Sequence, residues 1–261
     1  MPSSQVAGGG HVGFHKDMEP LRRAWRDILL TDIVIESAAC GTLRGYSAVG
    51  GTGPMPALIV LQEIFGVNAF IRGVVDRLAG EGFGVIAPDL FWRQEAGVAL
   101  DPAASDAYPK AMALMNGLDV DLAIVDIATT IAWARKQEWC NGKVGMIGYC
   151  LGGKLAFLSA SRCSIDAAVS YYGTGIHMLG DDFAPLKAPL LLQIAESDQL
   201  CPPEAQAAIK AAAQDNRFVE LLSYPGTGHA FARPGAPTYS QADATHADAK
   251  ALEFIRSALA N

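Results

Sequence analysis

A cysteine occupies the centre of a glycine-rich hexapeptide, Gly148-Tyr149-Cys150-Leu151-Gly152-Gly153. A strand-like run precedes this motif and a helix-like run begins inside it, which is the arrangement of a G-x-nucleophile-x-G elbow with cysteine in place of serine. The flanking glycines suit a tight, strained turn in which larger side chains would collide with the neighbouring strand and helix. The turn also places Cys150 at a helix N-terminus, where the helix dipole and free amides favour a thiolate. The sequence therefore predicts a nucleophilic Cys150.

The other cysteines receive a different interpretation, because a free cysteine is usually a small buried hydrophobe. The total of five is odd, and no two cysteines have CxxC spacing, so neither a disulfide framework nor a structural metal site is expected. This usage favours a reducing, cytoplasmic location. The residues interpreted as structural are Cys40, Cys140, Cys163 and Cys201.

An elbow nucleophile needs a base and an acid that orients it, in the chain order nucleophile, acid, histidine. Asp198 follows a strand-like run at 190–195, and His229 follows another at 219–224. Both therefore lie at carboxyl ends of strands, where α/β proteins place their sites. Glu196 competes for the acid role, but Asp198 is favoured because Glu196 directly abuts the strand. The other histidines are interpreted as surface residues; they are at positions 11, 15, 177 and 246.

The same architecture predicts an oxyanion hole formed by two backbone amides. One is the N–H of Leu151, directly after the nucleophile. The other is the N–H of Ile64, in the Gln62-Glu63-Ile64-Phe65-Gly66 segment that ends a strand-like run at 57–62. Glu63 is unusual there, because a carboxylate beside a cysteine favours the protonated thiol. We therefore expect Glu63 to have a functional role rather than to be a solvated loop residue.

These residues require an alternation of strands and helices. Short apolar runs followed by amphipathic runs predict βα units on a mostly parallel sheet of about eight strands, doubly wound, with helices on both faces. The first two strands have no helix between them, which predicts an antiparallel start. The expected strands cover 32–36, 43–48, 57–62, 84–87, 144–148, 167–172, 190–195 and 219–224. The expected helices cover 69–80, 104–115, 120–136, 151–161, 203–213 and 240–259.

The composition excludes several classes of protein. The chain has 261 residues, of which 51% are hydrophobic and 18% charged, so it is too apolar to be disordered. A formal net charge of −7 argues against a nucleic-acid partner, which would require a basic surface. No apolar run is long enough to cross a membrane, and no signal peptide is recognisable.

The N-terminal segment has its own pattern. Apolar residues at 21, 25, 28 and 29 are interspersed with arginines, which predicts a short amphipathic helix within a leader covering 1–30. The Gly8–Gly13 stretch matches GxGxxG, but no strand precedes it and no helix follows, so it is not expected to bind a dinucleotide. A single α/β domain is expected over 31–261.

Taken together, these motifs resemble the dienelactone hydrolases (carboxymethylenebutenolidases), members of the α/β-hydrolase superfamily. The resemblance extends from about residue 31 to the end of the chain. The segments that carry it are Gln62–Asn68, Pro88-Asp89-Leu90 with Arg93-Gln94, Gly148–Gly153, Tyr171-Tyr172-Gly173, Asp198, and Gly228–Arg233.

This resemblance implies a Cys150–His229–Asp198 triad that acts without a cofactor on a small anionic lactone. The cysteine would attack the enol ester of dienelactone (4-carboxymethylenebut-2-en-4-olide), form a thioester, and release maleylacetate, a step of (chloro)aromatic catabolism. Glu63 would interact with the resting thiol and deprotonate it when substrate arrives. Arg93 and Arg233 would bind the substrate carboxylate, and Tyr171 would line the pocket. Such arginines would supply local positive potential that the overall charge lacks.

Two alternatives remain open from the sequence. One is a general cysteine esterase or thioesterase with the same triad and a more permissive pocket. The other is a non-catalytic ligand-binding protein of the same fold, against which the joint presence of nucleophile, base and acid argues. The expected assembly is a monomer or small homo-oligomer, without nucleic-acid or membrane partners.

Overall fold

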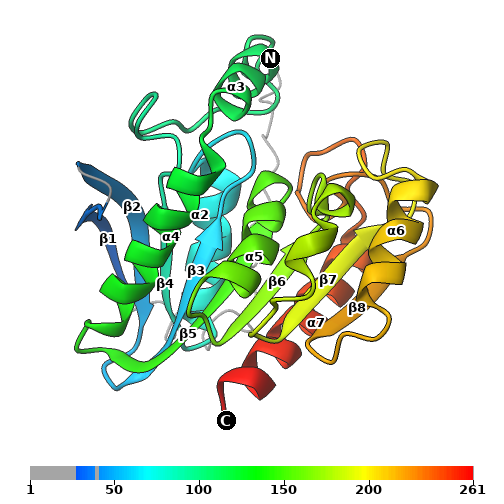
Figure 1. Cartoon of the computed structure of the whole chain (residues 1–261). Coiled ribbons are helices and arrows are strands. Elements are labelled where there is room, and N and C mark those ends of the chain that lie inside the picture. The colour runs from blue at the N-terminus through cyan, green and yellow to red at the C-terminus, as the bar shows by residue number, and fades with distance from the viewer. Residues whose placement is uncertain (1–27, 39–40, 261) are drawn as a thin grey trace, which may run out of the picture.

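The computed structural model describes residues 28–38 and 41–260, which fold around one eight-stranded sheet (Figure 1). The strand order is β1-β2-β4-β3-β5-β6-β7-β8. β2 pairs antiparallel with β1 and with β4, and all other neighbours are parallel. The strands are β1 (Ile28–Glu36), β2 (Thr42–Gly50), β3 (Met55–Leu61), β4 (Gly84–Pro88), β5 (Cys140–Tyr149), β6 (Ala167–Tyr171), β7 (Leu190–Ala195) and β8 (Val219–Tyr224).

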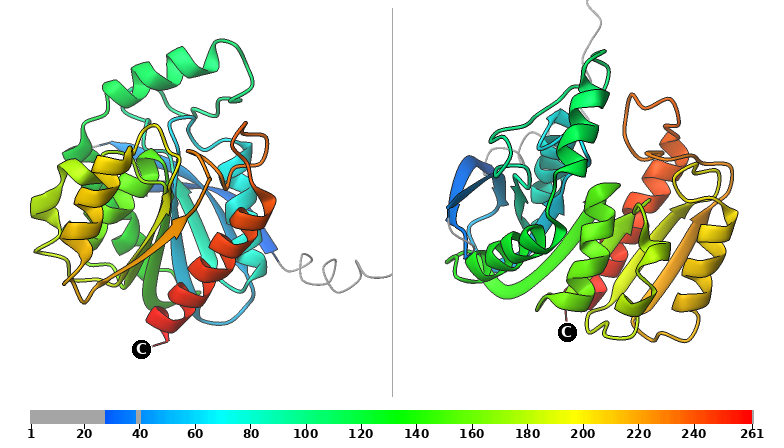
Figure 2. Two further views of the ribbon diagram at one scale, coloured as in Figure 1. Left: turned by 90° about the vertical axis from the view of Figure 1, so that its right-hand side faces the viewer. Right: turned by 45° about the horizontal axis from the view of Figure 1, so that its top comes forward.

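Helices cover both faces of this sheet. Figures 1 and 2 show α4, α5 and α6 on one face, and α2 and α7 on the other. The strand order, the single antiparallel strand β2 next to β1 and β4, and the helices on both faces define an α/β-hydrolase fold, as the sequence predicted. The helices are α2 (Ala69–Gly80), α3 (Ala107–Asn116), α4 (Val120–Arg135), α5 (Leu151–Arg162), α6 (Pro203–Ala213) and α7 (Gln241–Leu259), with two short 3₁₀ turns, η3 (Ile176–Met178) and η4 (Gly180–Asp182).

The central strands are buried on both sides, because helices pack on each face. Every residue of β4, β6 and β7 is buried. This explains why these strands have near-continuous apolar sequences rather than an alternating pattern. This packing fixes the carboxyl ends of the parallel strands. The predicted site residues lie in the segments that directly follow those ends.

Side chains cap the helices that start near that edge. Asn68 accepts a hydrogen bond from the Ile71 N–H at the start of α2, Asp119 does the same for Leu122 at the start of α4, and Ser240 for Asp243 in α7. Each cap satisfies an amide that has no partner within its helix. The predicted starts of α2 and α4 are confirmed for this reason.

Several predicted elements begin at other residues than expected. β1 begins at Ile28 rather than at residue 32, and β5 begins at Cys140 rather than at residue 144. Ile28 and Leu29 lie in β1, paired with Gly50 and Val49, rather than in the amphipathic helix expected at 21–29; the rest of that helix and most of the leader lie outside the described residues. The helix expected from residue 104 begins at Ala107 instead, because residues 101–106 form turns. The antiparallel start of the sheet is confirmed.

Within residues 28–38 and 41–260, no helix has the length and apolarity needed to span a bilayer. Over the same residues, no cluster of three or more histidine, cysteine or acidic side chains could hold a metal ion.

The elbow between β5 and α5 leaves no space for side chains. A Cβ on Gly152 would lie 2.3 Å from the Leu61 carbonyl oxygen, and one on Gly148 would lie 2.0 Å from the Gly152 carbonyl oxygen. Both contacts are with backbone, which cannot move aside as a side chain can. Gly152 is therefore required by the close approach of β3 to α5, and Gly148 by the tight turn of the elbow itself.

We expect Gly152→Ala to lower the free energy of unfolding by about 1–3 kcal/mol, as overpacking usually does. Gly80→Ala is the matched control, because a Cβ there would meet nothing within 4 Å. Urea denaturation followed by circular dichroism measures both variants. An unchanged midpoint for Gly152→Ala would contradict the packing argument.

Candidate active site

Cys150 lies at the tip of the elbow, as the N-cap of α5, with φ 54° and ψ −113°. It is one of three non-glycine residues with positive φ in the described part of the chain; the others are Tyr172 and Ala230. Tyr172 is in edge-to-face contact with the ring of His229, and Ala230 is the residue after His229. Backbone strain of this kind persists where surrounding structure enforces it, often at functional sites. All three strained residues therefore belong to, or lie next to, the pair formed by Cys150 and His229.

His229 and Asp198 are hydrogen bonded to each other, with 2.7 Å between Nδ1 and Oδ2. Asp198 is buried, and its other carboxylate oxygen accepts from the Leu200 N–H at 2.8 Å. The carboxylate is thus fixed in place and in turn fixes the imidazole. The structure brings together the acid and base predicted from chain order, and Glu196, the competing acid, is not the partner of His229.

Opposing effects act on the His229 imidazole. Burial favours the neutral form, but hydrogen bonding to Asp198 and the adjacent Cys150 outweigh it, and the pKa of His229 rises to about 10. Nε2 is buried and has no hydrogen-bond partner of standard geometry among the described residues. With Nδ1 on Asp198, the free Nε2 is the ring atom available to the nucleophile.

Glu63 and Arg233 form a second charged pair in this site. The Glu63 side chain is almost fully buried, and its Oε2 lies 2.5 Å from Nη1 of Arg233. The guanidinium also lies over the ring of Phe65, 5.2 Å from its centroid. Burial raises the pKa of Glu63, while Arg233 and His229 act to lower it. The other oxygen, Oε1, is buried without a partner in the described structure, so this carboxylate retains an unused acceptor.

The two amides predicted to form an oxyanion hole are available. Among the hydrogen bonds of the described residues, none uses the N–H of Ile64 or of Leu151. The next amide, Gly152 N–H, donates to the Gln62 carbonyl at 3.0 Å, which holds the start of α5 against the segment containing Ile64. Free amides that flank a nucleophile are suited to stabilising a developing oxyanion.

An open cleft of about 720 Å³ lies beside these groups, at the carboxyl edge of the sheet. Tyr149 and Arg233 contribute to its wall, and both are neighbours of the residues described above. Its remaining wall comes from α2, α7, and the segments around residues 99–102 and 232–239. The volume is in the range of small-molecule sites.

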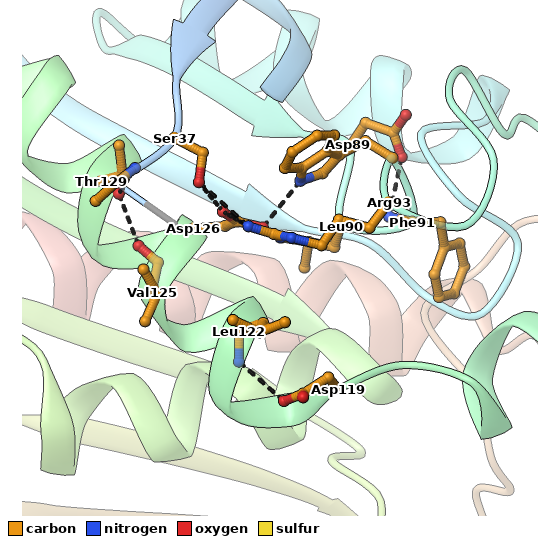
Figure 3. Close-up of polar contacts among 12 residues, drawn as sticks. Ser37, Asp89, Leu90, Phe91, Arg93, Asp119, Leu122, Val125, Asp126 and Thr129 are labelled. Carbon is orange, nitrogen blue, oxygen red and sulfur yellow. Dashed lines mark hydrogen bonds and ion pairs between the residues drawn. The ribbon is translucent and has the colours of Figure 1, made fainter. Parts of the chain in front are cut away.

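Arg93 does not join Arg233 in this cleft, contrary to the sequence-based expectation. Its guanidinium contacts both carboxylate oxygens of Asp126, which is fully buried in α4 (Figure 3). Asp126 also accepts from Ser37 Oγ at 2.6 Å and from Trp92 Nε1 at 2.9 Å. The turn after β4 carries Arg93 towards α4, where a buried carboxylate requires compensation. Arg93 therefore has a structural partner that its local sequence did not reveal.

Tyr171 also differs from its expected position. Its side chain is buried, its hydroxyl donates to Asp248 Oδ1 at 2.8 Å, and its ring stacks on Tyr149. It lies behind the cleft wall rather than in it. Tyr172, the next residue, faces His229 instead.

Sequence reasoning missed several residues of the site. Tyr172 belongs to the Tyr171-Tyr172-Gly173 segment, in which Tyr171 was the expected pocket residue; the positive φ that Tyr172 adopts just past the end of β6 has no local sequence signal. Arg77 and Asp248 lie on α2 and α7, form an ion pair at 3.0 Å, and line the cleft. No local signal distinguishes them from solvated helix residues, because only the packing of the two helices brings them together.

Comparisons with known proteins identify the family. The Dienelactone hydrolase family profile matches residues 43–259, and the chain belongs to this family. Carboxymethylenebutenolidase from Pseudomonas putida is 37% identical over 228 residues, covering 87% of this chain and 97% of that protein. Carboxymethylenebutenolidase 1 from Cupriavidus pinatubonensis is 34% identical with the same coverage. The chain is therefore a hydrolase of lactone or ester substrates.

Solved structures agree with the fold. A protein from Klebsiella pneumoniae, provisionally assigned as a dienelactone hydrolase, superposes with a TM-score of 0.78 at 28% identity, covering 88% of this chain and 98% of its own. A dienelactone hydrolase-like promiscuous phosphotriesterase from metagenomic libraries gives a TM-score of 0.73 at 20% identity, covering 88% and 98%. The second likeness concerns the fold alone.

Arg93→Met should lower the free energy of unfolding by about 3 kcal/mol, because it leaves the buried Asp126 carboxylate without its cation. The double variant Arg93→Met/Asp126→Leu should recover a substantial part of that loss, since it removes both charges. Thermal and urea unfolding measure the effect. Equal stability of wild type and Arg93→Met would refute this structural role.

The raised pKa of His229 predicts a pH-dependent contribution to stability. Because the folded-state value lies above the ordinary 6.5, the stabilisation is fully present below pH 6.5 and is lost as the pH rises towards about 10. The difference in unfolding free energy between wild type and His229→Gln should therefore shrink over this interval. Asp198→Asn, which removes the charged partner, should flatten the profile. A difference that grows with pH would have the wrong sign.

Proposed function

We propose that this protein hydrolyses dienelactone to maleylacetate through a Cys150 thioester, with His229 as base and Asp198 as the residue that orients it. The observation that carries the proposal is the contact chain Asp198–His229 beside Cys150, with the Glu63–Arg233 pair directly adjacent. This combination occurs in a chain that belongs to the Dienelactone hydrolase family. A carboxylate-bearing lactone suits such a site, because Arg233 offers a planar bidentate donor.

The first half of the reaction uses Glu63 as a displaceable base. A substrate carboxylate competes for Arg233, and Glu63, released from that pair, accepts the Cys150 thiol proton. The sulfur attacks the lactone carbonyl, while the Ile64 and Leu151 amides donate to the oxyanion. Collapse breaks the ring C–O bond and expels an enolate, which takes a proton from the His229 imidazolium and becomes a ketone. A low-basicity thiolate suffices for this attack because the enolate is a good leaving group.

The second half restores the enzyme. Once the sulfur is acylated, its contribution to the raised pKa of His229 is absent, so the neutral imidazole is a competent base for water. Hydroxide attacks the thioester, the thiolate leaves, and the product carboxylic acid loses its proton to solvent. Glu63 then returns its proton to Cys150. Asp198 keeps the imidazole oriented throughout, as in other triads.

A second candidate function is a broader cysteine esterase or thioesterase. The cleft of about 720 Å³ favours it, because this volume exceeds what a single small lactone ring would fill. Both candidates use the same nucleophile and base. They differ in how strongly turnover depends on a carboxylate near Arg233.

Ultraviolet loss of purified cis- and trans-dienelactone tests the proposal directly. Cys150→Ala should reduce kcat/KM by at least about 10³-fold, because removal of one triad member abolishes the covalent route. Cys163→Ala is the control, since Cys163 is buried away from the nucleophile elbow at the C-terminal end of α5. Turnover of simple aryl esters without turnover of either lactone would favour the second candidate. Retained activity in Cys150→Ala would overturn both.

A further inference from the structure

One part of the cleft is a groove lined by residues of α2 and α7. These two helices cover the face of the sheet opposite α5 (Figure 2). Phe70, Gly73, Val74 and Arg77 line it from α2, at the i, i+3, i+4 and i+7 positions of one helical face. Ala244, Thr245 and Asp248 line it from α7, and Tyr149, the residue before Cys150, lines it from the end of β5. The residues that line the groove from the two helices are mostly uncharged, and the Arg77–Asp248 pair is the charged part of this helical wall.

The Arg77–Asp248 pair is held in place by a buried residue of the sheet, Tyr171. Asp248 Oδ2 lies 3.0 Å from Arg77 Nη2, and Asp248 Oδ1 accepts from the Tyr171 hydroxyl at 2.8 Å. Both oxygens of Asp248 are thus engaged, and Tyr171 is buried in the core. The Arg77 side chain nevertheless remains 41% exposed. A guanidinium has five N–H donors, so Arg77 retains donors that can face the groove.

Arg77 lies well along α2 from the start of that helix. It lies seven residues beyond Phe70 along α2, which corresponds to about 10 Å at the helical rise of 1.5 Å per residue. Arg233, the partner of Glu63, also lines the cleft, so the cleft contains two arginines, one on α2 and one in the loop that follows His229. A ligand with anionic groups at both ends of an apolar chain matches this distribution of charge and surface.

We propose that Arg77 is a second anion-binding residue, and that the groove selects esters or lactones carrying a carboxylate remote from the scissile carbonyl, on a chain long enough to reach α2. The assignment of these ligands as substrates rests on the proposed function; the binding site itself does not. Arg77 recognises the remote carboxylate by directed hydrogen bonds, because its net charge is balanced by Asp248. Its fixed position limits the entropy lost on binding.

Binding, measured without turnover, tests the site. Isothermal titration calorimetry of the wild-type protein with linear dicarboxylates from succinate to sebacate should show an affinity maximum at a long chain. That dicarboxylate should bind about tenfold more tightly than the monocarboxylate of equal length. The double variant Arg77→Gln/Asp248→Asn, which keeps the net charge of the groove, should lose this advantage. Asp248→Asn alone should increase it, because Arg77 is freed from its partner.

The matched control is Arg135→Gln/Asp166→Asn, an ion pair of similar exposure outside the cleft, at 2.8 Å. It should leave the dicarboxylate advantage unchanged. Arg77→Lys, which keeps the charge without the fork of donors, should retain part of the advantage and covers the case in which the double variant fails to fold. No preference for dicarboxylates in the wild type, or a preference that survives in the double variant, would overturn the proposal.

A kinetic comparison then connects the site to substrates. The ratio of kcat/KM for mono-p-nitrophenyl suberate to that for p-nitrophenyl octanoate should fall in Arg77→Gln/Asp248→Asn, mainly through KM. Absence of turnover for every ester, with dicarboxylate binding intact, would refute the proposed function and leave the site standing. Turnover with an unchanged ratio would instead refute the groove as a substrate site.

Discussion

The close approach of α5 to β3 is the constraint on which the site depends. The Gly152 N–H donates to the Gln62 carbonyl at 3.0 Å, and the Cys150 N–H donates to the Tyr171 carbonyl at 3.0 Å. These two bonds fix the nucleophile between β3 and β6, and they place the amides of Ile64 and Leu151 on either side of it. Because the contact between α5 and β3 is between backbone atoms, it tolerates only glycine at position 152. The strained φ of Cys150 follows from this packing rather than from any preference of cysteine.

Burial and charge compensation explain why so many ionisable groups can share this small volume. Asp198 and Glu63 are both nearly inaccessible, yet each has a cationic partner, His229 and Arg233. An isolated buried carboxylate would instead become neutral or destabilise the fold. Pairing leaves one acceptor of Glu63 and one nitrogen of His229 unsatisfied, at the place where a ligand can supply the missing partners. The net charge of −7 therefore does not predict the charge of this site, because local packing determines which cationic side chains lie there.

The sequence predicted those features that depend on neighbours in the chain. The elbow needs only a strand, a glycine-flanked turn and a helix, all of which are local. Asp198 and His229 were found because parallel strands present their carboxyl ends at one edge. The predicted position of Arg93 in the substrate pocket was wrong because its side chain pairs with Asp126, which is 33 residues away in the chain. Nothing in the sequence of α4 indicates that Asp126 is buried. The same reason hid Arg77 and Asp248, which meet only when α2 and α7 pack on one face of the sheet.

Tyr171 and Tyr172 are adjacent in the chain but have different roles: one supports the Arg77–Asp248 pair and the other contacts the catalytic histidine. Strand β6 ends at Tyr171, whose side chain packs on the α7 side and holds Asp248. Tyr172 lies beyond the strand end and adopts a positive φ, and its own ring packs against His229. Two consecutive residues thus connect the groove with the catalytic residues. The Tyr171 hydroxyl fixes the Arg77–Asp248 pair, and the Tyr172 ring packs against the His229 imidazole. β5 pairs with β6 up to Tyr149 and Tyr171, directly before Cys150. The nucleophile therefore follows the end of β5, and the tyrosine that holds Asp248 of the groove lies at the end of β6. Because these two strand ends are hydrogen bonded to each other, the sheet fixes the distance between the nucleophile and the groove.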